Sequence, residues 1–428
     1  MNVSPMRVYF DYNATSPLAE DVTDAVVRAT RDVFGNASSV HHFGQQAKAT
    51  MDAARSAVAT LLNADLSEIV FTSGGTESDN FAIRGAAEAL EPTGRRHLIA
   101  SAIEHEAVLN TLKALARRGW RTTLLSVDQS GIVSPDRLRD AIGTDTAVVS
   151  VMQANNEIGT IQPIAALAAI AHEHGALMHT DAVQSAGKIP VDVRALGVDL
   201  LSMSAHKFNG PKGAGVLWIK RGTRMQPVLT GGKHERNRRA GTENVPAIAG
   251  LGVAARLAAG KLSVEAPRVA ALRDRLEAGI LRAVPGTAVN GAPESRVPNT
   301  TNISFERVEA ESLLIALDLE GVAVSTGSAC SSGTLEPSRA AGNGTGGAPD
   351  AELAPLQPRH VFDGRRSGPR DRGAAATRRE ASRLDSEDSA RLMRPRKHET
   401  TKKNTKKRID FSFSCLRGPG TFLTCESS

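Results

Sequence analysis

The chain has 428 residues, 41% hydrophobic and 23% charged, which is ordinary for a soluble globular protein and long enough for two domains. Its three cysteines, Cys330, Cys415 and Cys425, are too few and too scattered for a disulfide framework, so we expect a reducing, cytoplasmic setting. No apolar run approaches the roughly 20 residues of a membrane helix, and the N-terminus lacks the pattern of a signal peptide, so we expect no membrane partner.

The net charge of +6 is concentrated at one end of the chain. Residues 339–428 hold 19 Lys and Arg against 11 Asp and Glu, whereas residues 1–338 hold 33 against 35. The basic character therefore belongs to the C-terminal tail, and we expect no nucleic-acid partner for the globular body. Nucleic-acid binding through "KKNTKKR" is an alternative that rests on charge alone.

Short β-rich runs alternate with helical patterns between about residues 60 and 260. The expected strands are "IVFTSG", "HLIAS", "TTLLSV", "AVVSVMQ", "ALMHTDA", "DLLSMSA" and "AGVLWIK". Ser134 and Pro135 predict the start of one helix, and Gly175 predicts the end of another. This alternation predicts an α/β fold with a mostly parallel, doubly wound sheet, which binds ligands beyond the carboxyl ends of its strands.

A second, smaller α/β pattern begins near Lys261. We therefore expect a large domain over residues 16–260 and a small domain formed by residues 1–15 and 261–338. After about Ser338 the sequence has no sustained apolar period, which predicts a basic, disordered tail over residues 339–428.

The stretch "FTSGGTESDN" has the composition of a phosphate site. Gly74 and Gly75 permit close approach of the backbone, and Thr76 opens a helix whose free N–H groups attract anions. A structural alternative is a capping box between Thr76 and Asp79, which is compatible with phosphate binding.

Two further stretches place reactive groups directly after expected strands. Lys207 in "SMSAHKFNG" would be partly desolvated, which favours a nucleophilic amine that attaches an aldehyde cofactor, and Ser204 and His206 flank it with donors for an anion. Asp181 in "ALMHTDAVQ" is suited to pair with a protonated pyridine nitrogen. A surface lysine and a helix-capping aspartate are the alternatives for the two stretches.

Amide and imidazole groups follow two other expected strands. Asn155 offers amide donors for a ring oxygen, and His105 is suited to stack on an aromatic cofactor and to move protons. His172 and His174 are two residues apart on an expected helix and cannot easily share a metal, so we expect no metal site.

Together these stretches resemble the cysteine desulfurases of the NifS/IscS type, which are fold-type I enzymes dependent on pyridoxal 5'-phosphate (PLP) and belong to the class-V aminotransferases. The resemblance runs in order over residues 7–338. The motifs that carry it are "VYFDYNATSPL", "GNASSVHHFG", "FTSGGTESDN", "NNEIGTIQP", "HTDAVQSAGKIPVD", "SAHKFNGPKGAGVL", "RRAGTENV" and "STGSACSSGTLEPS".

The resemblance implies a role for each matching residue. Lys207 would attach the cofactor and move the substrate Cα proton, and His105 would stack on the ring and act as acid and base. The remaining cofactor contacts would be Asp181 at the pyridine nitrogen, Asn155 and Gln184 at the ring oxygen, Gly75, Thr76, Ser204 and His206 at the phosphate, and Thr242 at the phosphate of a second subunit in a homodimer.

The implied reaction converts L-cysteine to L-alanine, with the sulfur held as a persulfide on Cys330. The setting "SACSS" resembles the long-loop class, which serves iron–sulfur scaffolds and other sulfur acceptors, so Cys330 would also contact an iron–sulfur cluster on a partner. Alternatives are selenocysteine lyase, another class-V enzyme, or a catalytically impaired cofactor-binding protein.

The sequence departs from the family pattern at two places. Ala37 stands where the family usually has proline. After about Ser338 we find no counterpart of the strand whose arginine holds the substrate carboxylate, which is the observation behind the impaired alternative. We hypothesise that the sequence stops following the family at about Ser338 because of a frameshift in the coding DNA.

Overall fold

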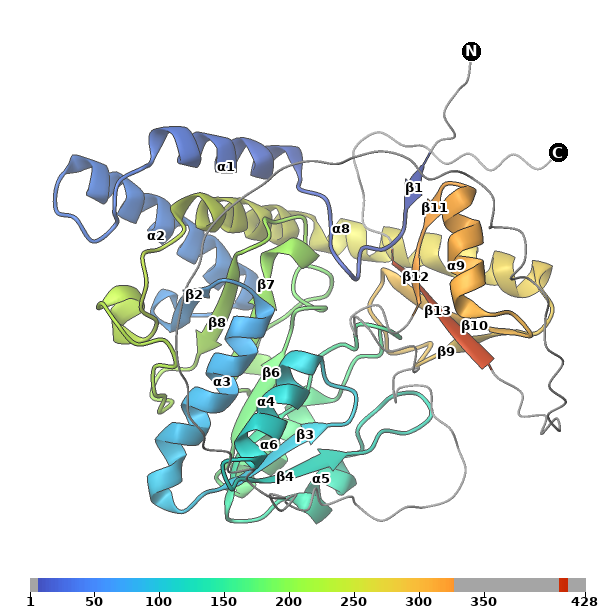
Figure 1. Cartoon of the computed structure of the whole chain (residues 1–428), viewed down its shortest axis with the longest axis horizontal. Coiled ribbons are helices and arrows are strands. Elements are labelled where there is room, and N and C mark those ends of the chain that lie inside the picture. The colour runs from blue at the N-terminus through green and yellow to red at the C-terminus, as the bar shows by residue number, and fades with distance from the viewer. Residues whose placement is uncertain (1–6, 327–407, 415–428) are drawn as a thin grey trace, which may run out of the picture. The chain divides into compact units, whose positions relative to one another are not determined.

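The computed structural model describes residues 7–326 and 408–414 of the chain. A seven-stranded sheet in the order β2-β8-β7-β6-β5-β3-β4 organises the larger part (Figure 1). Its strands are β2 (Ile69–Thr72), β3 (His97–Ser101), β4 (Arg121–Leu125), β5 (Thr146–Ser150), β6 (Leu177–Asp181), β7 (Leu200–Ser204) and β8 (Gly215–Ile219). Only β8 runs antiparallel to its neighbours in this sheet, so the predicted mostly parallel α/β architecture is confirmed.

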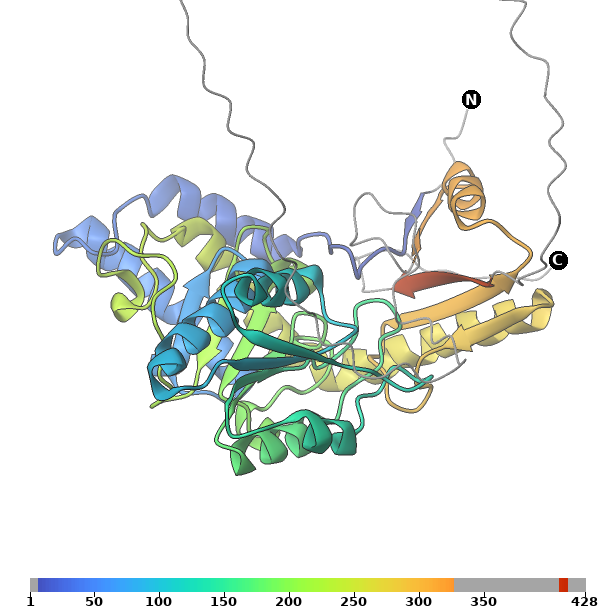
Figure 2. The same ribbon diagram turned by 60° about the horizontal axis from the view of Figure 1, so that its bottom comes forward.

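Helices cover both faces of this sheet, as Figure 2 shows. The helices are α1 (Glu20–Asp32), α2 (His42–Leu62), α3 (Gly75–Leu90), α4 (Glu106–Ala116), α5 (Pro135–Ala141), α6 (Ile164–Glu173), α7 (Val193–Leu196), α8 (Val245–Ala283) and α9 (Ala310–Leu319). Because side chains alternate along a strand, Val70 packs in one apolar cluster with α3 and α4, while Ile69 and Phe71 pack in the other with α2, α5, α6 and α8. The two clusters hold the strand ends that form the candidate site in fixed positions.

The predicted helix boundaries at three residues are confirmed. The Ser134 hydroxyl accepts a hydrogen bond from the Asp136 N–H at 3.3 Å, and Pro135 is the first residue of α5. Gly175 follows α6 with a φ of +69°, a left-handed conformation that glycine adopts without strain.

Helix α8 runs without interruption across the boundary expected near residue 260. Among the described residues, α8 alone has the length and the apolar composition of a membrane-spanning helix. No segment of this kind was expected from the sequence. Residues Ile248, Leu251 and Ala254 of α8 are buried, and the helix packs against α1 and α2. This part of α8 therefore lies in the protein core.

The second half of α8 packs in the smaller part of the fold. There a four-stranded sheet has the order β12-β13-β10-β9, and β1 pairs with β11 in a parallel two-stranded sheet. The strands are β1 (Val8–Tyr9), β9 (Thr287–Asn290), β10 (Thr300–Glu306), β11 (Val322–Ala323), β12 (Ser325–Thr326) and β13 (Arg408–Ser414). Leu276 and Ile280 of α8 pack with Leu314 and Leu317 of α9 around the buried Val324.

Strand β13 corrects the expectation for the C-terminal tail. Residues 339–428 were expected to be disordered, but Arg408–Ser414 form a strand that pairs antiparallel with β10 over seven register positions, and with β12. The expectation of a disordered tail is therefore wrong for these seven residues. The rest of the tail, with Cys415 and Cys425, lies outside the described residues.

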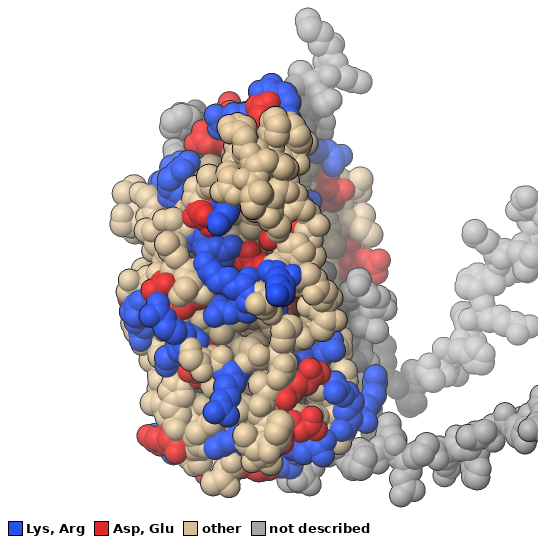
Figure 3. Space-filling model, turned by 90° about the vertical axis from the view of Figure 1, so that its left-hand side faces the viewer, with Lys and Arg blue, Asp and Glu red and all other residues tan. Residues whose placement is uncertain are grey.

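Charged side chains of both signs are mixed on the molecular face in Figure 3, with Lys and Arg gathered toward its middle. This mixture agrees with the near balance of 33 basic and 35 acidic residues in positions 1–338.

Candidate active site

The predicted site residues follow strands that lie side by side in the large sheet. Lys207 comes shortly after β7, Asp181 ends β6, Asn155 follows β5 and His105 follows β3, and these four strands are consecutive neighbours. Strand β2 points the same way as β7, so Thr76 lies at the same edge of the sheet. Parallel strands thus bring residues far apart in sequence to one crevice.

The amine of Lys207 is buried at the end of β7. Its side chain is 8% exposed, in a short 3-10 turn over Ala205–Lys207. Its Nζ donates hydrogen bonds to the main-chain carbonyl oxygens of Asn13 and, at 2.8 Å, of Ala14. The expectation that this lysine is desolvated is confirmed, and the surface alternative is wrong.

Asp181 is a buried carboxylate on the neighbouring strand. Its Oδ1 accepts a hydrogen bond from the Val183 N–H at 2.8 Å. Burial raises the pKa of Asp181, while the Val183 hydrogen bond and the positive charges of His105 and Lys207 oppose that rise. A cationic partner at this position would favour the ionised form of Asp181 further.

Two more carboxyl groups are buried close to Asp181. Glu104 accepts hydrogen bonds at Oε1 from the Ser101 hydroxyl and, at 2.8 Å, from the Met152 N–H. Burial, with a contribution from Asp181, raises the pKa of Glu104 to about 8. Burial also raises the pKa of Asp79, and lowers that of His179 to about 3. We infer that Glu104 and Asp79 are protonated at neutral pH, because a buried cluster cannot hold three unpaired negative charges.

A cavity of about 420 Å³ opens at the start of α3, and Ser204 and His206, which closely precede Lys207 in the chain, line it. It is lined by Ala14, Thr15, Ser73, Gly74, Gly75, Thr76, Glu77, Ser204, His206, Lys212 and Gly213. Gly75 packs so closely that an added Cβ would come within 2.8 Å of Val183 Cγ2. Burial, and next the positive charges of Lys207 and Lys212, lower the pKa of His206 to about 4.

The capping box proposed for the start of α3 is not formed. Helix α3 has Gly74 at its N-cap, no side chain caps it, and Asp79 Oδ1 is buried without a hydrogen-bond partner. The Glu77 carboxylate instead accepts a hydrogen bond from the Ser73 N–H at 2.8 Å. The uncapped N–H groups at this helix start favour an anion in the cavity.

The other predicted ring contacts are engaged within the chain. Gln184 donates to the Asn13 carbonyl oxygen at 3.0 Å and accepts from the amine of Lys188 at 2.6 Å. Asn155 donates to the Ile103 carbonyl oxygen at 3.2 Å. His105 caps α4 by accepting from the Ala107 N–H at 3.1 Å, and it also lines a second cavity of about 570 Å³ together with Thr76.

Thr242 is exposed and does not line the phosphate-type cavity of its own chain. The segment before it contains three consecutive residues in the left-handed region, Glu235, Arg236 and Asn237, with φ of 43°, 58° and 64°. Such a conformation costs about 1–2 kcal/mol per non-glycine residue, so other contacts must stabilise it.

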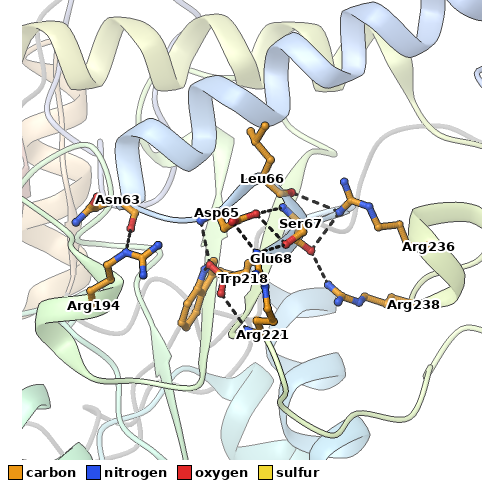
Figure 4. Close-up of polar contacts among 10 residues, drawn as sticks. All are labelled: Asn63, Asp65, Leu66, Ser67, Glu68, Arg194, Trp218, Arg221, Arg236 and Arg238. Carbon is orange, nitrogen blue, oxygen red and sulfur yellow. Dashed lines mark hydrogen bonds and ion pairs between the residues drawn. The ribbon is translucent and has the colours of Figure 1, made fainter.

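A buried ion pair and hydrogen bonds to a main-chain carbonyl oxygen hold this segment in place. Arg55 makes a two-pronged contact with the Glu235 carboxylate at 2.7 and 2.9 Å, and both side chains are buried. Figure 4 shows that Arg236 and Arg238 also donate to the Ser67 carbonyl oxygen, at 3.2 and 2.9 Å.

The same turn around Ser67 is tied to the large sheet. Glu68 accepts from the indole N–H of Trp218 in β8 at 3.1 Å, and Arg221 and Arg194 hold the same turn at Asp65 and Asn63 (Figure 4). The segment that carries Thr242 is therefore anchored to the core.

Sequence reasoning missed several residues of the site. Asn13, Lys188 and Lys212 were not singled out, although all three lie inside motifs that carry the resemblance. Glu104 lies directly before His105, and that position was the one available signal for it. Among the residues that the structure describes, no group of three or more His, Cys, Asp or Glu side chains could hold a metal ion. Cys330 lies outside the described residues.

The chemistry of the site fits a phosphate-bearing aldehyde such as PLP. The cavity combines an uncapped helix start with Ser204, His206 and Lys212, which suits a phosphate. The buried amine of Lys207 and the buried carboxylate of Asp181 suit the aldehyde and the pyridine nitrogen.

Comparisons with known proteins agree with this arrangement. The family model "Aminotransferase class-V" matches residues 8–344. The cysteine desulfurase IscS of Dictyoglomus turgidum is 50% identical over 332 residues, covering 78% of this chain and 84% of that protein. The cysteine desulfurase NifS of Azotobacter vinelandii is 47% identical over 332 residues, covering 77% and 82%.

Solved structures show the same fold. A structure titled "NIFS-like protein" has a TM-score of 0.73 at 40% identity and covers 75% of this chain and 88% of that one. A structure titled "SspA in complex with cysteine" has a TM-score of 0.66 at 36% identity and covers 75% and 89%. Since the family model spans most of the chain and these relatives match over most of their length, the chain belongs to the class-V aminotransferase family.

Proposed function

We propose that the chain is a PLP-dependent cysteine desulfurase that converts L-cysteine to L-alanine and carries the sulfur on Cys330. The relatives named cysteine desulfurase support the reaction, and the relative solved with cysteine supports the substrate. The observation that carries the proposal is the buried amine of Lys207 at the end of β7, beside the buried carboxylate of Asp181 at the end of β6.

The residues of the site have separate tasks in this reaction. PLP, when bound, supplies an electron sink for the bond-breaking steps. Lys207 would hold the cofactor through its amine and move the Cα proton, and the carbonyl oxygens of Asn13 and Ala14 orient that amine. Asp181 would pair with the pyridine nitrogen in its ionised form, which is electrostatically feasible if, as we infer, Glu104 and Asp79 carry protons.

The sulfur transfer balances without an added oxidant. The thiolate of Cys330 supplies the electron pair of a new S–S bond to the substrate sulfur. The Cβ–S bond of the substrate breaks, and its electron pair takes a proton at Cβ, which yields alanine. Cys330 then holds a persulfide, whose outer sulfur passes to an acceptor.

A second copy of the chain is the partner that the geometry favours first. Thr242 is exposed at the end of a segment anchored by Arg55 and Glu235, so it is presented outward. Phe34, Val40 and Phe43 expose 71%, 91% and 48% of their surface. A homodimer would bury such apolar side chains and bring Thr242 toward the phosphate cavity of the other subunit. Sedimentation velocity on wild type and Val40→Glu tests this, and a wild-type monomer would contradict it.

The sulfur acceptor is proposed to be an iron–sulfur scaffold or another acceptor protein in the cytoplasm. The names IscS and NifS of the relatives support the scaffold class. The few, scattered cysteines support a reducing location.

Sulfide release from L-cysteine in the presence of dithiothreitol tests the proposed reaction. We expect release from the wild type and from Cys415→Ser, which removes a cysteine of the tail, and none from Lys207→Ala. Cys330→Ser should still bind PLP but lose sulfide release. Wild-type protein with PLP absorbance but no release would contradict the reaction and favour the impaired alternative. Faster release from L-selenocysteine with no dependence on Cys330 would favour the lyase.

A further inference from the structure

A second lysine, Lys188, is buried near Lys207 and has no part in the chemistry described so far. Its side chain is 2% exposed and lies among the largest fully buried side chains of the described residues. Its Nζ donates a hydrogen bond to Gln184 Oε1 at 2.6 Å. Lys188 and Gln184 lie in two consecutive turns after β6, and Gly187 between them has a φ of +76°, so the backbone folds back and brings the two side chains together.

The surroundings of Lys188 do not favour a charged amine. Among the residues that the structure describes, it forms no ion pair with a carboxylate, and its hydrogen-bond partner is a neutral amide. Burial, and next the positive charge of Lys207, lower the pKa of Lys188 well below 10.5. An unpaired buried ammonium would be costly, so the amine is uncharged.

Lys188 belongs to a chain of hydrogen bonds that ends at Lys207. Gln184 donates from Nε2 to the Asn13 carbonyl oxygen at 3.0 Å, and the same oxygen accepts from the Lys207 amine. A carbonyl oxygen cannot donate, so the amide of Gln184 must present its NH₂ group to Asn13 and its oxygen to Lys188. Both ends of the amide are thus fixed.

We propose that Lys188 is a positioning residue: an uncharged buried amine that fixes the side-chain amide of Gln184 in one orientation and so links it, through Asn13, to Lys207. The inference rests on the proposed PLP site, because Gln184 is the residue that the family resemblance directs to the ring oxygen. The amide has a second N–H hydrogen, and the Lys188 contact determines where that hydrogen points.

The first test uses protein without PLP and measures urea unfolding of wild type, Lys188→Met and Lys261→Met from about pH 7 to pH 10.5. The unfolded chain binds a proton on Lys188 up to its ordinary pKa near 10.4, whereas the folded chain does not. Wild-type stability should therefore rise with pH through this window relative to Lys188→Met. Lys261, exposed on α8, is the control that removes a lysine without a buried amine. A constant midpoint difference between wild type and Lys188→Met would overturn the inference.

The second test measures PLP dissociation and the pH midpoint of bound-PLP absorbance for Lys188→Met, Gln184→Leu and the double variant. We expect Lys188→Met to weaken PLP binding roughly tenfold, the effect of one oriented hydrogen bond, and to shift the absorbance midpoint. In the Gln184→Leu background the same change should add nothing, because Lys188 acts through Gln184. Lys261→Met is again the control. Additive effects of the two changes on PLP affinity, or equal PLP affinity in Lys188→Met and Lys261→Met, would overturn the inference. Failure of the wild type to bind PLP would instead contradict the proposed function, and the urea series would then decide on Lys188.

Discussion

The main-chain carbonyl of Asn13 accepts a hydrogen bond from the amine of Lys207, although 194 positions separate the two residues. The Asn13 side chain also donates to the Asn156 carbonyl oxygen at 3.1 Å and to the Thr300 hydroxyl at 3.0 Å, and it accepts from Asn299 at 3.1 Å. One buried residue of the N-terminal segment thus connects Lys207 to β10 in the smaller part of the fold.

Replacing Asn13 with alanine should therefore affect both stability and catalysis. Several buried polar groups lose their partner, so we expect a loss of about 1–3 kcal/mol in the free energy of unfolding. The Asn13 carbonyl would also be less well fixed, which should lower sulfide release per folded molecule. Urea unfolding and the L-cysteine assay measure the two effects. Asn290→Ala is the control, because it removes a hydrogen bond to Asn302 away from Lys207; equal sulfide release by the two variants would contradict the expectation.

Glu104 should give the fold a pH dependence that a neutral residue would not. Its pKa is about 8 in the folded chain against 4.5 as the ordinary value, so the folded state holds the proton more tightly. This stabilising contribution is present in full below about pH 4.5, decreases as the pH rises, and is lost above about pH 8. Glu104→Gln should lack this slope and gain stability relative to wild type between pH 5 and about pH 8.

Urea midpoints measured at several pH values test this prediction. The matched control is Glu106→Gln, an exposed residue of the first turn of α4. Parallel midpoint curves for wild type and Glu104→Gln would show that Glu104 is ionised in the folded chain, contrary to our inference.

The sequence predicted the large sheet well because its strands are continuous apolar, β-rich runs bounded by turn residues. "VVSVM" and "LLSMS" are buried on both faces, as parallel strands between two helix layers require. The positions of Lys207, Asp181, Asn155 and His105 followed from the rule that parallel strands end at one edge. Local pattern and global topology agree here, so sequence alone was sufficient.

The parts that sequence could not predict depend on contacts between distant residues. Lys188 occurs in "SAGKIP", which has the composition of a surface turn, and its burial results from the elements packed around it. The pairing of β13 with β10 joins residues more than 100 positions apart, across a segment without apolar periodicity. The raised pKa of Glu104 results first from its burial and then, to a smaller extent, from its proximity to Asp181, and the strand order creates both.

Glu77 links the start of α3 to the segment that carries Thr242. Its carboxylate accepts from the Ser73 N–H at 2.8 Å and from the Arg239 guanidinium at 2.7 and 3.1 Å. The hydrogen bonds to Arg239 and Ser73 together outweigh the effect of burial and lower the pKa of Glu77, so it is ionised at neutral pH.

Glu77→Ala should loosen the phosphate-binding turn and weaken PLP binding by about tenfold, because charge-assisted hydrogen bonds of this kind contribute roughly 1.5–3 kcal/mol. Equilibrium dialysis against PLP measures the change. Glu88→Ala on the same helix is the control, since its pair with Arg118 at 3.2 Å is largely exposed and should matter little. Equal PLP affinity in the two variants would show that the turn is held without Glu77.

Strand β13 gives the C-terminal tail a structural function that truncation can test. It lies between β10 and β12, so its removal leaves both strands with unpaired N–H and C=O groups facing each other. A chain that ends at residue 407 should unfold at lower urea concentration and self-associate through these exposed edges. A chain that ends at residue 414 keeps β13 and is the matched control. Urea unfolding and sedimentation velocity compare the two; if both truncated chains match the full chain, β13 contributes nothing to the small sheet, and the tail is dispensable as the sequence pattern first indicated.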